Sequence, residues 1–107
     1  MKSRRPYELV YDREVMQHLE VVERKYYSLI ERTIEQQLSY EPDVEAKNRK
    51  PLLRPTAVGA DWELRFGPDN RFRVFYRIHR ANWEVHILAI GIKKGSRLFI
   101  GGRRFGL

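Results

Sequence analysis

The sequence has 107 residues and a mass of 12.9 kDa, which is enough for one domain and too little for a second large core. With 42% hydrophobic and 33% charged residues, the composition argues against a wholly disordered chain. Cysteine is absent, which excludes disulfide frameworks, thiolate zinc sites and cysteine nucleophiles. The longest apolar stretch, 87–92, falls far short of the roughly 20 residues of a membrane span. The basic arm 1–5 has no apolar segment behind it, unlike a secretory signal. We therefore expect a single domain over residues 1–107 in a reducing, cytoplasmic location.

Charge is unevenly distributed along the chain. The formal net charge is +7 and the pI is about 10.0. Residues 1–46 contain 7 Lys or Arg and 10 Asp or Glu, which gives a net charge of −3. Residues 47–107 contain 14 Lys or Arg and 4 Asp or Glu, which gives a net charge of +10. The positive charge of the C-terminal part indicates a polyanionic partner, nucleic acid first. An ordinary basic, solvated surface is the alternative.

The N-terminal part predicts a strand followed by helix. Residues 7–11 are aromatic and β-branched, as in a strand, and Asp12 is a suitable helix N-cap. Apolar residues then recur at three- and four-residue steps, which is one face of an amphipathic helix: Val15, Leu19, Val22, Tyr26, Ile30, Ile34 and Leu38. The pattern permits one long helix, or two helices with a break near residues 20–25. Pro42 ends the helical region.

The rest of the chain predicts a linker and a sheet. Residues 41–61 are rich in proline and charge, with the basic residues Lys47, Arg49, Lys50 and Arg54. Apolar residues then alternate over 62–66, 72–78 and 83–90, with a turn at 67–70 and a short last strand at 98–100. The predicted fold class is α+β, a small antiparallel or mixed sheet of about four strands with the helical region packed on one face.

Alternation places a distinctive set of side chains on the uncovered face. Glu63, Arg65, Arg73, Phe75, Arg77 and His86 point outward, rimmed by the linker cluster and by Lys93, Lys94 and Arg97. Arginine binds phosphate, an aromatic ring stacks a splayed base, and a carboxylate or imidazole can take a proton from a ribose 2′-hydroxyl. The alternative is a solvated face with cross-strand ion pairs such as Glu63 with Arg73. His79 and His86 are clustered imidazoles, but without cysteines no metal site is expected. His18 is interpreted as a helix-flank residue.

The order of motifs resembles the RelE/ParE family of toxins from type II toxin–antitoxin modules. The resemblance covers nearly the whole chain, and four segments carry it: 48–52 (Asn-Arg-Lys-Pro-Leu), 62–66 (Trp-Glu-Leu-Arg-Phe), 71–76 (Arg-Phe-Arg-Val-Phe-Tyr) and 90–95 (Ile-Gly-Ile-Lys-Lys-Gly). It implies a small sheet with an N-terminal helical hairpin, and for this reason two helices are preferred over one.

The family implies two different activities. RelE-like members are ribosome-dependent endoribonucleases that cut mRNA without a metal, by attack of the ribose 2′-hydroxyl on the adjacent phosphate. ParE-like members share the fold, lack this chemistry and inhibit DNA gyrase. By position, Arg73 matches the arginine that stabilises the scissile phosphate, Arg65 matches a strand lysine, and Lys93 or Lys94 matches a basic residue after the last core strand.

Two positions depart from the RelE pattern. Glu63 stands where a second strand lysine is expected, and Phe99 stands where the family has a tyrosine. Glu63 is therefore a candidate general base and His86 a candidate general acid. The predicted catalytic residues are Glu63, Arg65, Arg73, His86 and Lys93, and the predicted RNA-binding residues are Lys47, Arg49, Lys50, Phe75, Arg77, Lys94, Arg97 and Phe99.

The sequence thus predicts a RelE-like mRNA endoribonuclease that needs no cofactor or metal. Its expected partners are mRNA, the ribosome and a cognate antitoxin that lays an acidic or amphipathic segment over the basic face, with oligomers formed through the antitoxin and no membrane association. Two alternatives remain open. One is a ParE-like gyrase inhibitor, and the other is an RNA-binding member of the fold without activity, which the Phe99 departure favours.

Overall fold

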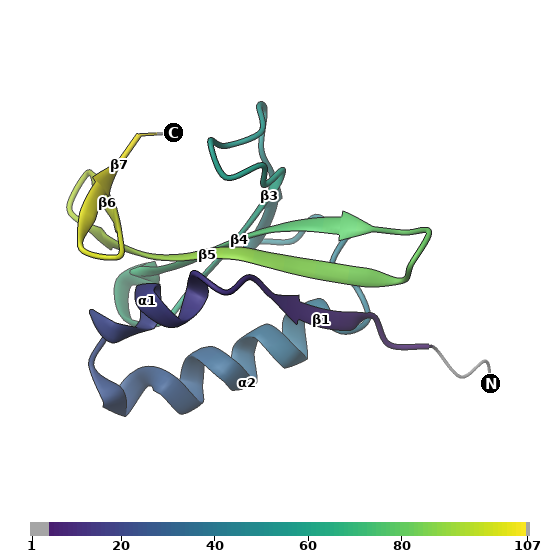
Figure 1. Cartoon of the computed structure of the whole chain (residues 1–107), viewed down its shortest axis with the longest axis horizontal. Helices are drawn as coiled ribbons and strands as arrows, with labels where there is room; N and C mark the ends of the chain where they lie inside the picture. Colours follow the sequence, from purple (N-terminus) through teal and green to yellow (C-terminus); the bar gives the residue numbers. More distant parts are fainter. Residues whose placement is uncertain (1–4, 107) are drawn as a thin grey trace.

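The structure is a computed structural model that describes residues 5–106. Residues 1–4 of the predicted basic arm, and residue 107, lie outside the described residues. In this part of the chain a β-sheet has two α-helices on one face (Figure 1). No helix of the described residues has both the length and the apolar character needed to cross a bilayer.

The helical region is divided, as the resemblance predicted. Helix α1 (Val15–Glu20) is followed by a 3₁₀ turn (Arg24–Tyr26) and by α2 (Tyr27–Leu38). The carbonyl of Leu19 accepts from the Val22 N–H at 2.9 Å and from the Tyr27 hydroxyl at 2.7 Å, and the second bond ties the end of α1 to the start of α2. The break at residues 21–23 lets the apolar stripes of both helices face the sheet.

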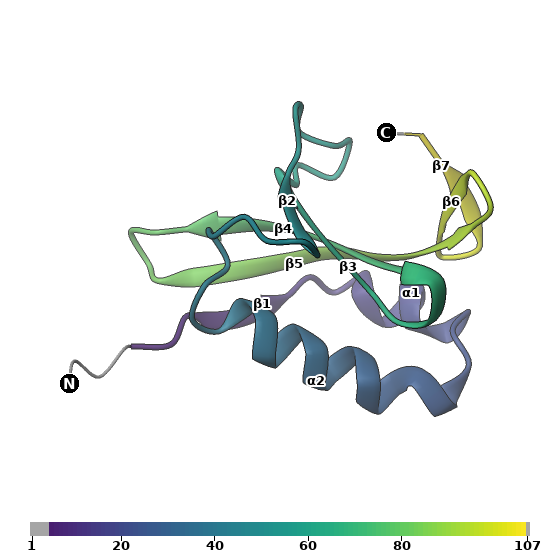
Figure 2. The same ribbon diagram turned by 180° about the vertical axis from the view of Figure 1, so that it is seen from behind.

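Within residues 5–106 the sheet has seven strands, so the prediction of about four strands is wrong. They are β1 (Glu8–Tyr11), β2 (Arg49–Pro51), β3 (Trp62–Phe66), β4 (Phe72–His79), β5 (Glu84–Lys94), β6 (Arg97–Ile100) and β7 (Arg103–Phe105). Strands β2 to β7 pair in chain order and antiparallel. Figure 2 shows the sheet and the helices below it from behind. Strand β1 pairs in parallel with β5, next to Glu84–Ile87, whereas β6 takes the same edge of β5 further along, at 91–94.

The main core lies between the sheet and the helices. It joins Ile30, Ile34 and Leu38 of α2 to the inward side chains predicted from alternation, among them Leu64, Phe66, Phe72, Val74, Tyr76, Val85 and Ile87. The Tyr76 hydroxyl donates to the carbonyl of Pro42 at 2.7 Å, so the linker is tied to the core at its start. The predicted facing of β3, β4 and β5 is therefore confirmed.

A second, smaller core covers part of the face away from the helices. The loop between β2 and β3 and the β6–β7 hairpin both rise from that face (Figure 1). Ala60, Phe75, Ala89 and Leu98 are buried there, and Leu52, Val58, Leu88, Ile100 and Phe105 pack against them. The rings of Phe75 and Phe105 lie 6.2 Å apart between centroids. This face is thus only partly open.

Candidate functional site: a cationic cleft beside a buried ion-pair network

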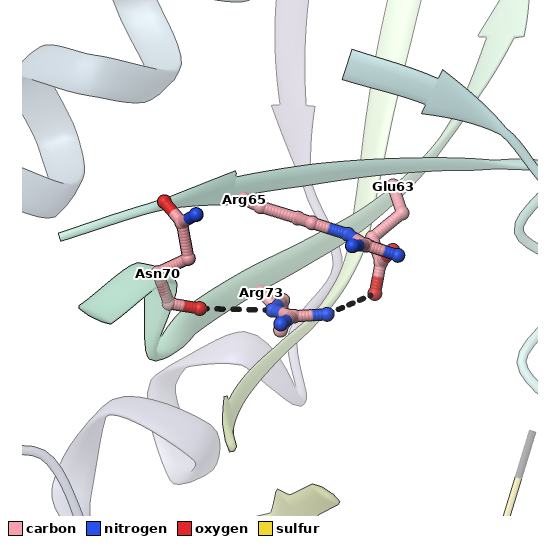
Figure 3. A network of polar contacts seen from close by, with 4 residues as sticks. All are labelled: Glu63, Arg65, Asn70 and Arg73. Carbon is pink, nitrogen blue, oxygen red and sulfur yellow. Dashed lines mark hydrogen bonds and ion pairs between the residues drawn. The ribbon is translucent and has the colours of Figure 1, made fainter. Parts of the chain in front are cut away.

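The centre of the uncovered face is an ion-pair network on β3 and β4 (Figure 3). Arg65 Nε lies 2.8 Å from Glu63 Oε1, and Arg73 Nη1 lies 3.3 Å from Glu63 Oε2. Arg65 and Arg73 are direct cross-strand partners, an arrangement in which two like charges repel. The carboxylate of Glu63 contacts both guanidinium groups, so the network keeps a net charge of +1 while the repulsion is offset.

Arg73 is held from a second side by the turn that precedes β4. Its Nε donates to the carbonyl oxygen of Asn70 at 3.0 Å (Figure 3). Two of its five N–H donors are used in these two contacts, and the side chain is 8% exposed. A guanidinium fixed at both edges is preorganised, because it loses little further freedom when it binds an anion.

Arg73 lines an open cleft of about 490 Å³ where the start of β4 meets the end of β5. The cleft is lined by Asp69, Arg71, Arg73, Ile92, Lys93, Lys94 and Gly95. The backbone N–H of Lys93 donates to the carbonyl of Arg71 at 2.7 Å, which holds the end of β5 beside the start of β4. Four cations therefore line one cleft with a single carboxylate, and this is a site suited to a phosphate group.

The structure corrects the predicted exposure of two residues. Glu63 lies on the predicted face, but it is only 1% exposed and both its oxygens contact arginines. Phe75 is fully buried, because the second core covers it, and it offers no free ring for stacking. Glu63 therefore holds the two arginines in place, and Phe75 is part of the second core.

His86 and Arg77 lie at the other end of the face and not at the cleft. Gly91 of β5 is the cross-strand partner of Arg73, and His86 lies five residues before it on the same strand. At the usual rise per residue of a strand, five residues span about 16 Å. His86 Nε2 contacts Glu84 Oε1 at 2.9 Å, and the His86 ring stacks on His79 at 4.1 Å between centroids. Arg77 donates from Nε to His79 Nε2 at 3.2 Å. The structure does not bring the predicted general acid together with Arg73.

The linker cations divide between the two faces. Arg49 pairs with Leu64, so it points to the helix side, and its guanidinium donates to the carbonyl of Val44 and to Gln37 of α2. The expectation that Arg49 lies on the uncovered face is wrong. Lys50 pairs with Glu63 on the uncovered face and forms a 3.5 Å ion pair with Glu45, while Lys47 is exposed.

The remaining predicted residues lie at the end of β5 and on β6. Phe99 pairs with Ile92, so it lies on the hairpin face away from the second core, and Lys94 Nζ lies 5.6 Å from the centre of its ring. Arg97 is opposite Lys94 and exposed. Residues 85–107 contain five Lys or Arg and no Asp or Glu, so this surface extends the positive cleft.

Arg71 and Asp69 line the cleft but were not among the predicted site residues. Arg71 lies two residues before Arg73, so alternation places both side chains on the same face of the sheet. Starting the predicted strand one residue earlier would have identified Arg71. Asp69 has a φ of 54°, in the left-handed region, and lies in a turn whose side-chain directions alternation does not predict.

His18 has a structural role near the site. It is buried, and its Nδ1 accepts a hydrogen bond from the backbone N–H of Ile90 at 3.2 Å, which fixes α1 to β5 one residue before Gly91. Burial lowers the pKa of His18, and the carboxylates of Glu14 and Asp12 partly oppose this shift. His18 is therefore a core residue and not the helix-flank residue that the sequence indicated.

Within residues 5–106, no group of three or more His, Cys, Asp or Glu side chains is arranged to hold a metal ion.

Comparison with known proteins identifies the fold. No family model matches the sequence, and no curated protein matches it. The structure is similar to a chain in the crystal structure of the toxin–antitoxin complex RelBE2 from Mycobacterium tuberculosis, with a TM-score of 0.67 and 22% sequence identity. The match covers 87% of this chain and 98% of the other. The RelE-like fold predicted from the motifs is thus confirmed.

Proposed function

We propose that this chain is the toxin of a type II toxin–antitoxin module and acts as an endoribonuclease that cuts mRNA on the ribosome. The fold it shares with a chain of the RelBE2 complex and the order of its RelE-like motifs support the assignment to this class. The ribosome and mRNA are its targets, the cytoplasm is where it acts, and a cognate antitoxin neutralises it.

The observation that carries the proposal is the arrangement of Arg73 in the cleft. Glu63 and the Asn70 carbonyl fix its guanidinium, and Lys93 lines the same cleft. When the ribose 2′-oxygen attacks the scissile phosphorus, negative charge grows on the phosphoryl oxygens. A preorganised guanidinium stabilises that charge without reorganising in the transition state. Lys93 adds a second positive charge and has a proton to give to the leaving 5′-oxygen.

An acidic segment of the antitoxin is the expected inhibitor. Four cations line the cleft, and Arg97 is the exposed cross-strand partner of one of them, Lys94. A row of carboxylates lying on these cations would take the place of the RNA phosphates. A short acidic reading frame beside the gene would support this partner.

A second candidate function is gyrase inhibition of the ParE kind. Three observations favour it: Glu63 is buried in ion pairs, His86 is remote from the cleft, and Phe99 has no hydroxyl. Neither of the predicted proton-transfer residues, Glu63 and His86, is therefore available in the cleft, and Phe99 cannot replace them. A chain that binds DNA gyrase through the same cations would need no such group.

The test is primer extension on mRNA in programmed ribosomes with the purified protein. We expect cleavage by the wild type and a loss of about 100-fold for Arg73→Ala, the usual cost of removing one transition-state donor. Arg32→Ala is the matched control, because it removes an exposed arginine from α2, away from the cleft. Wild-type activity that is equal on free RNA would contradict ribosome dependence. No cleavage under any condition, with inhibition of gyrase supercoiling, would establish the second candidate.

A further inference from the structure

The cleft contains one carboxylate to which no function has been assigned. Asp69 is exposed and lines the cleft with Arg71, Arg73, Lys93 and Lys94. Among the described residues no ion pair joins it to any of these cations, whereas Glu63, on the neighbouring strand, makes two. The oxygens of Asp69 therefore remain available to a bound ligand, next to groups that would bind the phosphate of that ligand.

The turn that carries Asp69 also orients the two arginines of the cleft. The carbonyl of Pro68 accepts from Arg71 Nε at 3.2 Å, and the carbonyl of Asn70 accepts from Arg73 Nε at 3.0 Å. Asp69 lies between these two carbonyls in the chain. One short segment thus constrains the position of Asp69 relative to both guanidinium groups, and Glu63 on β3 holds Arg73 from the other side.

The backbone of this turn is held in a rarely populated conformation. Asp69 has φ 54° and ψ 28°, and Asn70 has φ 51°. Two successive residues other than glycine in the left-handed region cost energy, and such strain persists only where surrounding contacts determine the conformation. Relaxing either residue would turn the carbonyls away from Arg71 and Arg73, so these hydrogen bonds and the direction of the Asp69 side chain are coupled.

Cleavage by a 2′-hydroxyl needs a group that accepts its proton, and the other candidates do not meet this need. Glu63 has both oxygens occupied by arginines and is buried. His86 lies about 16 Å along β5 from the partner of Arg73. Asp69 is the carboxylate that shares the cleft with Arg73 and Lys93.

We infer that Asp69 is the general base of the reaction, an inference that rests on the proposed endoribonuclease activity. Its carboxylate takes the proton of the ribose 2′-hydroxyl as the 2′-oxygen bonds to phosphorus. Arg73 stabilises the charge on the phosphoryl oxygens, and Lys93 protonates the 5′-oxygen as the P–O5′ bond breaks. The products are a 2′,3′-cyclic phosphate and a 5′-hydroxyl end. The protonated Asp69 and the neutral Lys93 then exchange a proton through water.

The test compares Asp69→Asn with the wild type on ribosome-bound mRNA. Asparagine adopts the left-handed region readily and keeps the shape of the side chain, so this change removes the base without disturbing the turn. We expect cleavage to fall 100-fold or more, as for loss of general base catalysis, with RNA binding unchanged or tighter. Asp61→Asn is the matched control, because Asp61 is exposed and lies just before β3, whereas the cleft lies beyond the other end of that strand.

A further readout separates a base from a merely structural residue. In Asp69→Gly, where glycine also tolerates the backbone, added formate should restore part of the cleavage because it can occupy the vacated place. Wild-type cleavage that depends on Arg73 but survives Asp69→Asn within twofold would overturn the inference and leave the proposed function standing. A wild type that cuts no RNA would overturn both.

Discussion

Arg73 and Glu63 form an ion pair on adjacent strands, with Nη1 and Oε2 3.3 Å apart and both side chains less than one-tenth exposed. A buried pair of this kind contributes little net stability over an apolar pair of the same shape, but removing one partner leaves an uncompensated charge. Glu63 thereby allows Arg65 and Arg73 to face each other beside the cleft, and its importance to the cleft is that it holds Arg73 in place.

Glu63→Ala should destabilise the protein strongly. The change leaves the guanidinium of Arg73 buried without its carboxylate, so we expect the free energy of unfolding in urea to fall by about 3 kcal/mol. Glu45→Ala is the control, because the Lys50–Glu45 pair is exposed and should be worth about 1 kcal/mol or less. Equal effects of the two substitutions would contradict the structural role of Glu63.

Stability should fall in mild acid because of His18. Burial lowers the pKa of His18 in the folded state below its unfolded value of 6.5, so the unfolded chain binds the proton more readily. The contribution of His18 is therefore fully present above pH 6.5 and declines as the pH falls from there through the lower folded-state pKa. Urea unfolding at pH 7.5 and at pH 5 measures it. His18→Asn keeps an acceptor for the Ile90 N–H without titrating, and it should flatten this dependence. An unchanged pH slope would exclude His18 as the cause.

Gly67→Ala should destabilise more than Gly95→Ala. Both glycines have positive φ, 84° and 61°, and alanine there costs about 1 kcal/mol. A Cβ at Gly67 would also lie 2.4 Å from Cδ2 of the buried Phe72 ring, whereas one at Gly95 meets nothing within 4 Å. We expect an extra loss of about 2 kcal/mol at Gly67, measured by thermal or urea unfolding. Equal free energies of unfolding for the two variants would contradict the close packing of the turn against the Phe72 ring.

RNA affinity should depend on salt through the hairpin cations. Each phosphate contact with single-stranded RNA contributes about 0.7 to the slope of log affinity against log salt concentration. Arg97 is exposed on the hairpin that extends the cleft, so Arg97→Ala should reduce this slope by about 0.7 for a noncleavable RNA. Arg32→Ala on α2 should leave it unchanged. Fluorescence anisotropy across a salt series measures both, and equal slopes for the two variants would place the RNA elsewhere.

Alternation predicted the faces of the central strands well, because it depends only on the two-residue period of a strand. Leu64, Val74 and Val85 lie in the main core, and Arg65 and Arg73 lie on the opposite face, as predicted. The helix break was not determined by periodicity, since both arrangements place the same residues on one face. It depends partly on the contact of Tyr27 with Leu19, which the sequence does not reveal.

Burial on the uncovered face could not be predicted from local pattern. Phe75 is covered by residues far from it in the chain, among them Leu52, Val58 and Phe105. The strands β2 and β7 have three residues each, too short for alternation to identify. The separation of His86 from Arg73 follows from the register of β4 and β5, which includes a bulge between Phe75 and Tyr76. Register is a property of the paired strands, so a single strand's sequence did not predict it.

The parallel pairing of β1 with β5 has a consequence for the order of folding during synthesis. Glu8 leaves the ribosome early, yet its partner is Glu84, and the helices and three further strands are made in between. The N-terminal strand therefore waits without a partner until most of the chain has emerged, and contacts between such distant residues slow folding. The nascent protein should acquire its sheet, and with it the cleft, late in its own translation.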